Sequence, residues 1–460
     1  LAKSRFLSDC WQVFCMEVIV DLLNDSVKNL YFRYLFPSMG SAVVASVYLM
    51  TDAVVIGKGI GDNALAALNM TTPIISFMLS IGILFGIGGS VLFSVHKGTG
   101  DDEKANKCFT TALLGVLSAA IIICVLFNIF DKQILSLMGA KDELFDLAFD
   151  YVRFYYYFAI PSVLVNFCSA FVRSDKDPNR AMIAVTAGGI VNVVFDIVLV
   201  YPAQMGMAGA AIASVSGITV QLLVCLTHFL SKKNTIRISK PIKVLKNTFQ
   251  ILKGGLSGFI TELSNAIIIF VFNLQLLNYC SNAELAVYGV LANCAILFNA
   301  LFVGVGQAVQ PVSAFNFGAG QNGRIANLRK YAYSTVLIMG VIFALSGIFF
   351  PELVASCFID LTDATREVTK TAMPIYFIAF FAMGVNVLST YYFQSLMKGG
   401  YSLAVSMLRN IIISSVLLIT LPMLFGGFAI WFAIPITEAV VAVISFILLI
   451  KNNKQMKSKV

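Results

Sequence analysis

Twelve stretches of mostly apolar residues run along the chain, and charged residues gather between them. A membrane-spanning helix needs about 20 such residues, and each stretch is at least that long. The predicted spans are 34–57, 70–95, 108–130, 147–172, 181–202, 207–231, 254–279, 288–315, 331–350, 372–396, 403–426 and 428–450. The gaps after 202 and 426 are so short that the helices on either side must be antiparallel neighbours.

The composition is also typical of a polytopic membrane protein. Of the 460 residues, 58% are hydrophobic and 12% are charged, whereas about 25% of a soluble domain is charged. Disordered chains have the opposite composition. Two histidines and nine scattered cysteines favour neither a His-rich metal enzyme nor a disulfide framework. We therefore predict an all-α polytopic membrane protein without a cofactor.

Lysine and arginine are distributed unequally between the two sets of loops. Of the 32, 25 fall on the side that holds both chain ends and the stretch 232–253, five fall on the opposite side, and two lie inside spans. Cytoplasmic loops carry the excess of positive charge. We therefore expect a multi-pass protein of the plasma or inner membrane with both termini in the cytoplasm. The net charge of +8 then faces anionic lipid rather than nucleic acid.

The sequence repeats at an offset of 220 residues. The matches are 64–66 with 284–286, Gly86 with Gly306, Gly98 with Gly318, Gly100 with Gly320, Pro202 with Pro422, and Gly206 with Gly426. Parallel repeats place two six-helix bundles around a pseudo-two-fold axis along the membrane normal, with the substrate between them. The predicted parts are an amphipathic N-terminal segment 1–33, bundles at 34–231 and 254–450, a cytoplasmic linker 232–253 and a basic tail 451–460.

Four oxygen-bearing side chains of the first half fall at similar depths in three spans. At about 1.5 Å per residue, Asp52 lies about 8 Å, Asp196 about 9 Å and Ser214 about 10 Å below the outer end of its helix. Asn192 lies one turn from Asp196 on the same helical face. Charged groups in a span are costly and usually functional, so we expect these four residues to form one site.

This set of groups suits two kinds of coupling ion. Carboxylate, amide and hydroxyl oxygens are hard ligands that suit Na⁺. Two carboxylates in a dry site instead favour bound H⁺, because both cannot ionise cheaply. Either reading makes Asp52, Asn192, Asp196 and Ser214 a coupling site, and they are metal ligands only if the ion is Na⁺.

The second half lacks this set. At the 220 offset, the positions of Asp52, Asn192 and Asp196 are occupied by Phe272, Ile412 and Val416. The half instead carries Glu262, about 12 Å from the inner end of its span, and Glu438, about 15 Å from the outer end. Both lie near mid-membrane, where substrates bind. A structural ion pair with Arg409 is the alternative role for Glu438.

Several segments, taken in order, resemble the multidrug and toxic compound extrusion (MATE) family over nearly the whole chain. They are Leu-Phe-Pro at 35–37, Thr-Asp-Ala-Val-Val-Ile-Gly at 51–57, Ala-Leu-Ala-Ala-Leu at 64–68, Asn192-x-x-x-Asp196, Gly-x-x-Gly-Ala-Ala-Ile-Ala-Ser at 206–214, Gly-Gln-Ala-Val-Gln-Pro at 306–311, and Asn-Phe-Gly-Ala at 316–319. No single segment is decisive, but the ordered set is specific.

The resemblance implies a two-bundle efflux antiporter that exchanges Na⁺ or H⁺ for organic cations. It implies that the four first-half residues form the ion or proton site, with Ser214 where the family often has threonine. Glu262 matches a second-half carboxylate of one branch, but the further acidic residue which that branch carries on the tenth helix is missing here. We include Glu438, Gln310 and Asn293 as substrate-binding candidates. The expected partners are small organic cations and the lipid bilayer, and the expected state is a monomer.

Two other classes of protein compete with this interpretation. A flippase of related architecture, which moves a lipid-linked headgroup, would favour a cationic cavity that holds phosphate, whereas Glu262, Glu438 and Arg409 are together acidic. The stretch 59–62 spells the GxGD pattern of intramembrane aspartyl proteases, but it lies in a predicted outer loop, where Gly and Asp form turns. We therefore expect a transporter rather than an enzyme, with the flippase as the alternative function.

Overall fold

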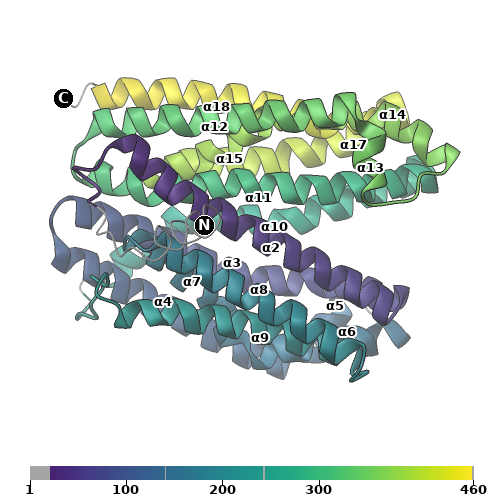
Figure 1. Cartoon of the computed structure of the whole chain (residues 1–460), viewed down its shortest axis with the longest axis horizontal. Helices are drawn as coiled ribbons and strands as arrows, with labels where there is room; N and C mark the ends of the chain where they lie inside the picture. Colours follow the sequence, from purple (N-terminus) through teal and green to yellow (C-terminus); the bar gives the residue numbers. More distant parts are fainter. Residues whose placement is uncertain (1–20, 140, 242–243, 458–460) are drawn as a thin grey trace, which may run out of the picture.

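The computed structural model describes residues 21–139, 141–241 and 244–457, and every regular element in these ranges is a helix. Figure 1 shows two stacked layers of roughly aligned helices, one from each half of the sequence. The first half contains α2 (Val27–Gly59), α3 (Asp62–Gly98), α4 (Asp102–Ile129), α5 (Asp131–Leu137), α6 (Asp142–Tyr157), α7 (Ala159–Ser174), α8 (Pro178–Val200), α9 (Gly206–Leu226) and the 3₁₀ turn η1 (Thr227–Leu230).

The second half repeats this order. It contains α10 (Val244–Tyr279), α11 (Asn282–Gly318), α12 (Asn322–Phe349), α13 (Pro351–Ser356), α14 (Asp363–Phe377), α15 (Ala379–Ser395), α16 (Gly399–Met407), the π-helix η2 (Leu408–Ile412), α17 (Ile413–Phe425), the 3₁₀-helix η3 (Gly427–Phe432) and α18 (Ala433–Lys457). Both α11 and α12 begin and end 220 residues after α3 and α4. The repeat in the sequence is therefore a repeat of helices.

The predicted twelve spans are confirmed among the described residues. Eleven helices are long and apolar enough to cross a bilayer, and α6 with α7 makes a twelfth span that is bent by 61°. The bend lies at Phe158, where the sequence predicted an unbroken helix over 147–172. The short outer helices α5 and α13 were not predicted, because seven and six residues are too few to leave a clear periodic pattern.

Several helices extend past the apolar stretches that predicted them. The first span begins at Val27 rather than at 34, α10 begins inside the predicted linker, and α18 continues into the predicted tail. A helix end is set by capping rather than by the bilayer surface, and the Ser26 side chain accepts the N–H of Asn29 (3.3 Å). Of the predicted N-terminal segment, residues 1–20 lie outside the described ranges and 27–33 belong to α2.

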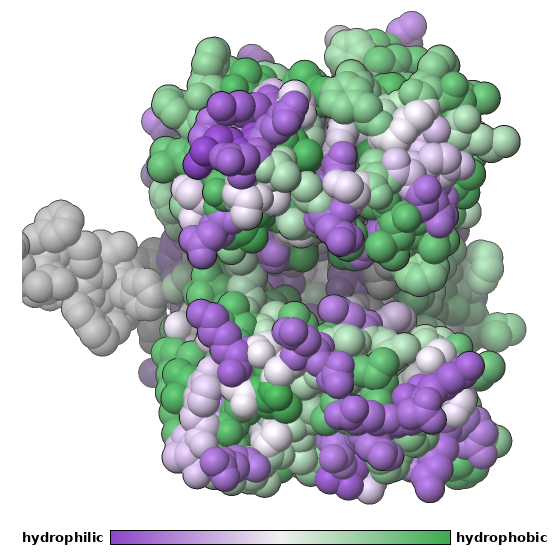
Figure 2. All heavy atoms as spheres, turned by 90° about the vertical axis from the view of Figure 1, so that its right-hand side faces the viewer, coloured by the Kyte–Doolittle hydropathy of each residue, from purple (hydrophilic) through white to green (hydrophobic). Residues whose placement is uncertain are grey.

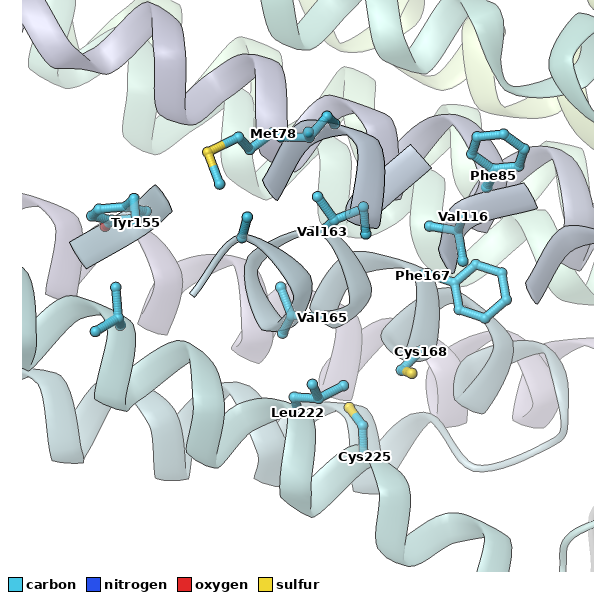
Figure 3. Close-up of a cluster of buried hydrophobic side chains, with 14 of the residues drawn as sticks. Met78, Phe85, Val116, Tyr155, Val163, Val165, Phe167, Cys168, Leu222 and Cys225 are labelled. Atoms are coloured by element: carbon cyan, nitrogen blue, oxygen red, sulfur yellow. The ribbon is translucent and has the colours of Figure 1, made fainter. Parts of the chain in front are cut away.

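Each half has its own apolar core. In the first half, α7 lies between α3, α4, α6 and α9, and Val163 and Phe167 point into the cluster drawn in Figure 3. Met78 from α3 and Leu222 from α9 meet it from two sides. A separate cluster forms the core of the second half.

The outward surfaces of the helices are apolar as well. Exposed large apolar side chains cover α4, α8, α12 and α18, among them Ile121, Ile122, Val125, Ile190, Val194, Ile338, Ile342, Val443, Phe446 and Ile447. A soluble protein rarely exposes apolar patches of this extent. Lipid chains cover such a surface without cost, so these residues form the lipid-facing belt.

The first helix of each half contributes to both cores. In α2, Tyr34 belongs to the second-half core and Ile56 to the first-half core. In α10 the order is reversed, because Ile251 belongs to the first-half core and Phe272 to the second-half core. Both helices therefore connect the two bundles.

The bundles meet at the end of the molecule that holds the basic loops. There α3 and α11 approach backbone to backbone: a Cβ on Gly98 would lie 2.0 Å from the carbonyl oxygen of Phe315, and a Cβ on Gly318 would lie 2.0 Å from that of Val95. The two contacts are related by the 220 offset. An apolar cluster extends the seal with Ile87, Val91, Val95 and Ala314.

At the opposite end the bundles separate. Figure 2 views this end, which is the right-hand end of Figure 1, and shows a hollow between an upper and a lower half with polar residues along its rims. The protein is thus closed at the basic end and open at the other end.

We predict that Gly98→Ala weakens the closed end, because the added methyl group meets a backbone carbonyl that cannot move aside without separating α3 from α11. The measurement is labelling of a cysteine placed at the buried Ala314, in a variant without the native cysteines, by a membrane-impermeant maleimide from the basic side. Labelling should be severalfold faster than in the parent. Gly323→Ala is the matched control, since nothing lies within 4 Å of its added Cβ. Equal labelling rates would contradict the prediction.

A buried charged cluster holds the start of the linker against the turn between α7 and α8. The His228 ring lies between two carboxylates, with Nε2 2.8 Å from Asp175 Oδ2 and Nδ1 3.2 Å from Asp177 Oδ2. The backbone N–H of Thr235 donates to Asp175 (2.8 Å). The side chains of Asp175, Asp177 and His228 are at most 3% exposed.

Electrostatics at this turn favour the charged form of Asp177. Burial alone would raise its pKa, but hydrogen bonds from His228 and Arg180 and the nearby charge of Lys233 lower the pKa to about 2. A lowered pKa in the folded state stabilises that state above the ordinary value of 3.8. The contribution is lost as the pH falls from there towards 2.

We predict that Asp177→Asn loosens residues 231–239 at neutral pH, because it removes one of the charges that hold His228, Arg180 and Lys233 together. Hydrogen–deuterium exchange should be faster there, and the loss of protection between pH 4 and pH 2 should be smaller than in the parent. Asp150→Asn, a change at a half-exposed ion pair with Arg153, is the control. Unchanged protection of residues 231–239 in Asp177→Asn would show that Asp177 does not hold the start of the linker in place.

Candidate functional site

Asp52, Asn192, Asp196 and Ser214 lie together in the first bundle, as the sequence predicts. They come from α2, α8 and α9, and their exposed fractions are 6%, 3%, 0% and 9%. Asn192 and Asp196 lie one helical turn apart and project from the same face of α8. The Asp52 and Asp196 carboxyl groups are close enough to interact electrostatically.

A fifth residue, Tyr151 on α6, connects the others. Its hydroxyl donates to Asp52 Oδ2 (3.3 Å) and lies 3.4 Å from Ser214 Oγ. The Asn192 amide also donates to Ser214 Oγ (3.3 Å). Tyr151 was not predicted from the sequence, because tyrosines are common in spans and the predicted span 147–172 has no bend at Phe158. Its place in the outer half of the span, level with Asp52, was the available signal.

Several oxygens of this site lack a hydrogen-bond donor among the described residues. They are Asp52 Oδ1, Asn192 Oδ1 and both carboxylate oxygens of Asp196. Leaving a buried polar atom unsatisfied costs about 1–3 kcal/mol, and more when it is charged. Four such oxygens at one place can together accept a positive charge.

The chemistry of these oxygens suits two occupants. Carboxylate, amide and hydroxyl oxygens from three helices are the hard donors that Na⁺ prefers. A proton on one carboxyl group would instead let it donate to the other carboxylate. Both occupants remove the repulsion between Asp52 and Asp196.

The four substrate-binding candidates of the second half have different surroundings. Glu262 on α10 is half-buried and has no hydrogen-bond or ion-pair partner among the described residues. Tyr48 is within electrostatic reach of both Glu262 and Asp52, so Glu262 lies on the side of the second bundle that faces the first. Its carboxylate is free to meet a cation.

Gln310 and Asn293 on α11 are engaged within the protein. The Gln310 amide donates to Gln394 Oε1 (2.7 Å), and Gln394 donates to Ser257 (2.8 Å), so this chain of bonds joins three helices. Asn293 donates to Gly289 O in its own helix (2.9 Å).

Glu438 forms the ion pair that the sequence analysis kept as an alternative. Arg409 Nε donates to Glu438 Oε1 (2.7 Å), and Asn386 Nδ2 donates to Oε2 (2.7 Å). Glu438 is 3% exposed. In this arrangement both of its oxygens already have donors.

Solved structures of similar proteins have the same fold. This chain resembles the outward-facing conformation of a multidrug resistance MATE family transporter of the MOP superfamily, with 22% identity, a TM-score of 0.88, and coverage of 95% of this chain and 98% of that one. It resembles a MOP superfamily transporter from Pyrococcus furiosus, described as having a binding pocket of reverse polarity, with 22% identity, a TM-score of 0.86 and the same coverage.

Sequence comparison finds relatives of the same length. The chain is 24% identical over 436 residues to the multidrug export protein MepA of Staphylococcus saprophyticus, covering 92% of this chain and 93% of that protein. It is 22% identical over 422 residues to MepA of Staphylococcus aureus, covering 90% and 92%.

The MatE family model matches both halves separately, at residues 37–198 and 258–420. The two matches repeat the pseudo-symmetry of the helices and together cover most of the chain. The protein therefore belongs to the MatE family of membrane transporters, the family that its motifs resemble.

Proposed function

We propose that this protein is a secondary active multidrug efflux transporter that exchanges H⁺ or Na⁺ for organic cations by alternating access. The observation that carries the proposal is the set of buried oxygens without donors on Asp52, Asn192 and Asp196. A small cation or a proton satisfies them. Binding of the cation or proton to this site can therefore drive a change in conformation.

The shape of the molecule supports the direction of transport. The bundles are sealed at the end with the basic loops, and the hollow opens at the other end (Figure 2). Basic loops mark the cytoplasmic side, so both termini lie in the cytoplasm and the protein spans the plasma or inner membrane. This arrangement is then an outward-open state. Cargo that binds to the inward-open state is released from this outward-open state.

The free charges of the interior support a cationic cargo. Arg409 is neutralised by Glu438, whereas Asp52, Asp196 and Glu262 have no cationic partner in the part of the chain that the structure describes. A lipid-linked phosphate would be repelled by these carboxylates, which disfavours the flippase. The names of the relatives, multidrug export proteins, support varied organic cargo. A monomer is sufficient for the activity, because both bundles lie in one chain.

The coupling site predicts the effect of Asp196→Asn. This change removes a charge that the ion neutralises, so ion-driven efflux of a fluorescent organic cation should fall at least about tenfold. The assay uses everted membrane vesicles with Na⁺ and pH gradients imposed separately, which also identifies the coupling ion. Asp146→Asn, at an exposed carboxylate of α6, should transport normally. Undiminished ion-driven efflux by a well-expressed Asp196→Asn would disprove the assignment.

The free carboxylate of Glu262 predicts a different phenotype. In Glu262→Gln the coupling site is intact, but a charge that attracts the cargo is gone. The KM for a monovalent organic cation should rise about tenfold, the equivalent of about 1.4 kcal/mol, with little change for an uncharged substrate. Ion binding to the empty transporter should stay at the parental level. An equal loss for charged and uncharged substrates would rule out the cargo role.

A further inference from the structure

The second bundle contains a buried ion pair whose surroundings resemble an ion site. Glu438 on α18 faces Arg409 at 2.7 Å, and Arg409 is 11% exposed. Asn299 Oδ1 lies 3.5 Å from a second guanidinium nitrogen. Asn386 bonds the other Glu438 oxygen and itself accepts from Ser445 (3.1 Å). One carboxylate oxygen and one amide oxygen thus face a single positive charge, and the second amide, of Asn386, holds the carboxylate.

Arg409 and Glu438 lie on helices that correspond to two helices of the first-half site. Arg409 lies in η2, between α16 and α17, which together match α8, and Glu438 lies on α18, which matches α9. Tyr376 on α14, the match of α6, is within electrostatic reach of the pair. The pair lies one to two turns deeper than Asp196 and Ser214, because Arg409 precedes the Val416 position by seven residues, or about 10 Å.

The rest of the first-half site has no counterpart here. Phe272 stands at the position of Asp52 and is fully buried, stacked on Tyr288 with ring centroids 3.9 Å apart. Ile412 and Val416 replace Asn192 and Asp196. Among the described residues, Glu438 is therefore the carboxylate of this region, and its positive partner is the Arg409 side chain of the same protein.

We propose that Arg409 is a built-in cation that occupies a masked monovalent-cation site formed by Glu438 and Asn299, with Asn386 holding the Glu438 carboxylate in place. The second bundle then binds no coupling ion of its own. Removal of the guanidinium leaves a carboxylate that must take up Na⁺ or H⁺. The inference rests on the proposed function, because it takes the first bundle as the bundle that binds the ion.

The π-helix gives the local reason for this arrangement. A π-turn widens the helix by one residue and is frequent at functional sites. Here it spans Leu408–Ile412 and contains Arg409. A buried ion pair is weak evidence for stability by itself, since an apolar pair of similar volume often does as well. A role in fixing the number of bound ions accounts for a charge pair at this place.

The test counts ions on purified protein in lipid nanodiscs. The readouts are ²²Na⁺ bound per molecule at pH 8 and protons taken up between pH 8 and pH 5. Arg409→Gln should bind one ion more than the parent, about a twofold increase if the parent binds one. Arg409→Gln/Glu438→Gln should return to the parental number, and Arg409→Lys should keep it. Equal ion numbers in Arg409→Gln and the double variant would overturn the inference.

Stability provides a second readout if Arg409→Gln folds poorly. Its thermal midpoint should rise with Na⁺ concentration or with falling pH more steeply than that of the double variant, because an ion compensates the unpaired carboxylate. The masked site does not exist if the double variant folds but Arg409→Gln fails to fold at every Na⁺ concentration and every pH in this range. The single variant Asp196→Asn separates the two proposals. If it still binds the parental number of ions, the proposed function is overturned. The masked site is tested separately, by the comparison of Arg409→Gln with the double variant.

Discussion

An uncompensated charge inside a bilayer is the constraint on which the interior of this protein depends. Water is absent there, so each buried carboxylate needs a proton, a cation or a fixed counter-charge. The two bundles meet this need in different ways. Within the described ranges, Asp52 and Asp196 have no cationic partner and keep oxygens without donors, whereas Glu438 is held by Arg409 and Asn386. In the function proposed here, one bundle thus leaves its charge to an ion from solution, and the other supplies its own cation.

The same contrast appears in the packing of the equivalent helices. In the first bundle α8 and α9 touch through glycines, since a Cβ on Gly188 would lie 2.6 Å from Gly217 O and a Cβ on Gly217 would lie 2.7 Å from Gly188 O. In the second bundle Arg409 and Glu438 stand between α17 and α18 at a π-turn. The duplicated fold therefore fixes the positions of helices but not their chemistry.

Much of this organisation could be predicted from the sequence. Long apolar runs, the bias of basic loops and the 220-residue offset depend on local composition, and they gave the spans and the repeat. The convergence of Asp52, Asn192, Asp196 and Ser214 could be predicted because depth along a helix follows from residue count. Contacts between side chains on different helices could not be predicted, because the rotation of each helix about its axis is set by tertiary packing. Tyr151 was missed for that reason, and the choice between cargo and Arg409 as the partner of Glu438 stayed open. Helix ends beyond the bilayer and the break at Phe158 leave no mark in hydropathy.

The path of α2 links the proposed ion site to the closed end of the molecule. Asp52 and Ile56 lie in its outer part, within the first bundle, whereas Tyr31 and Tyr34 near its other end pack in the core of the second bundle, and the Tyr31 hydroxyl donates to Thr335 (2.7 Å). Between them, Gly304 of α11 approaches the Met39 backbone so closely that an added Cβ would lie 2.9 Å from its Cα. A packed helix transmits a displacement rather than absorbing it. In the proposed function, an ion that draws Asp52 towards Asp196 therefore acts on the same helix that contacts the second bundle near its other end, about 30 Å further along.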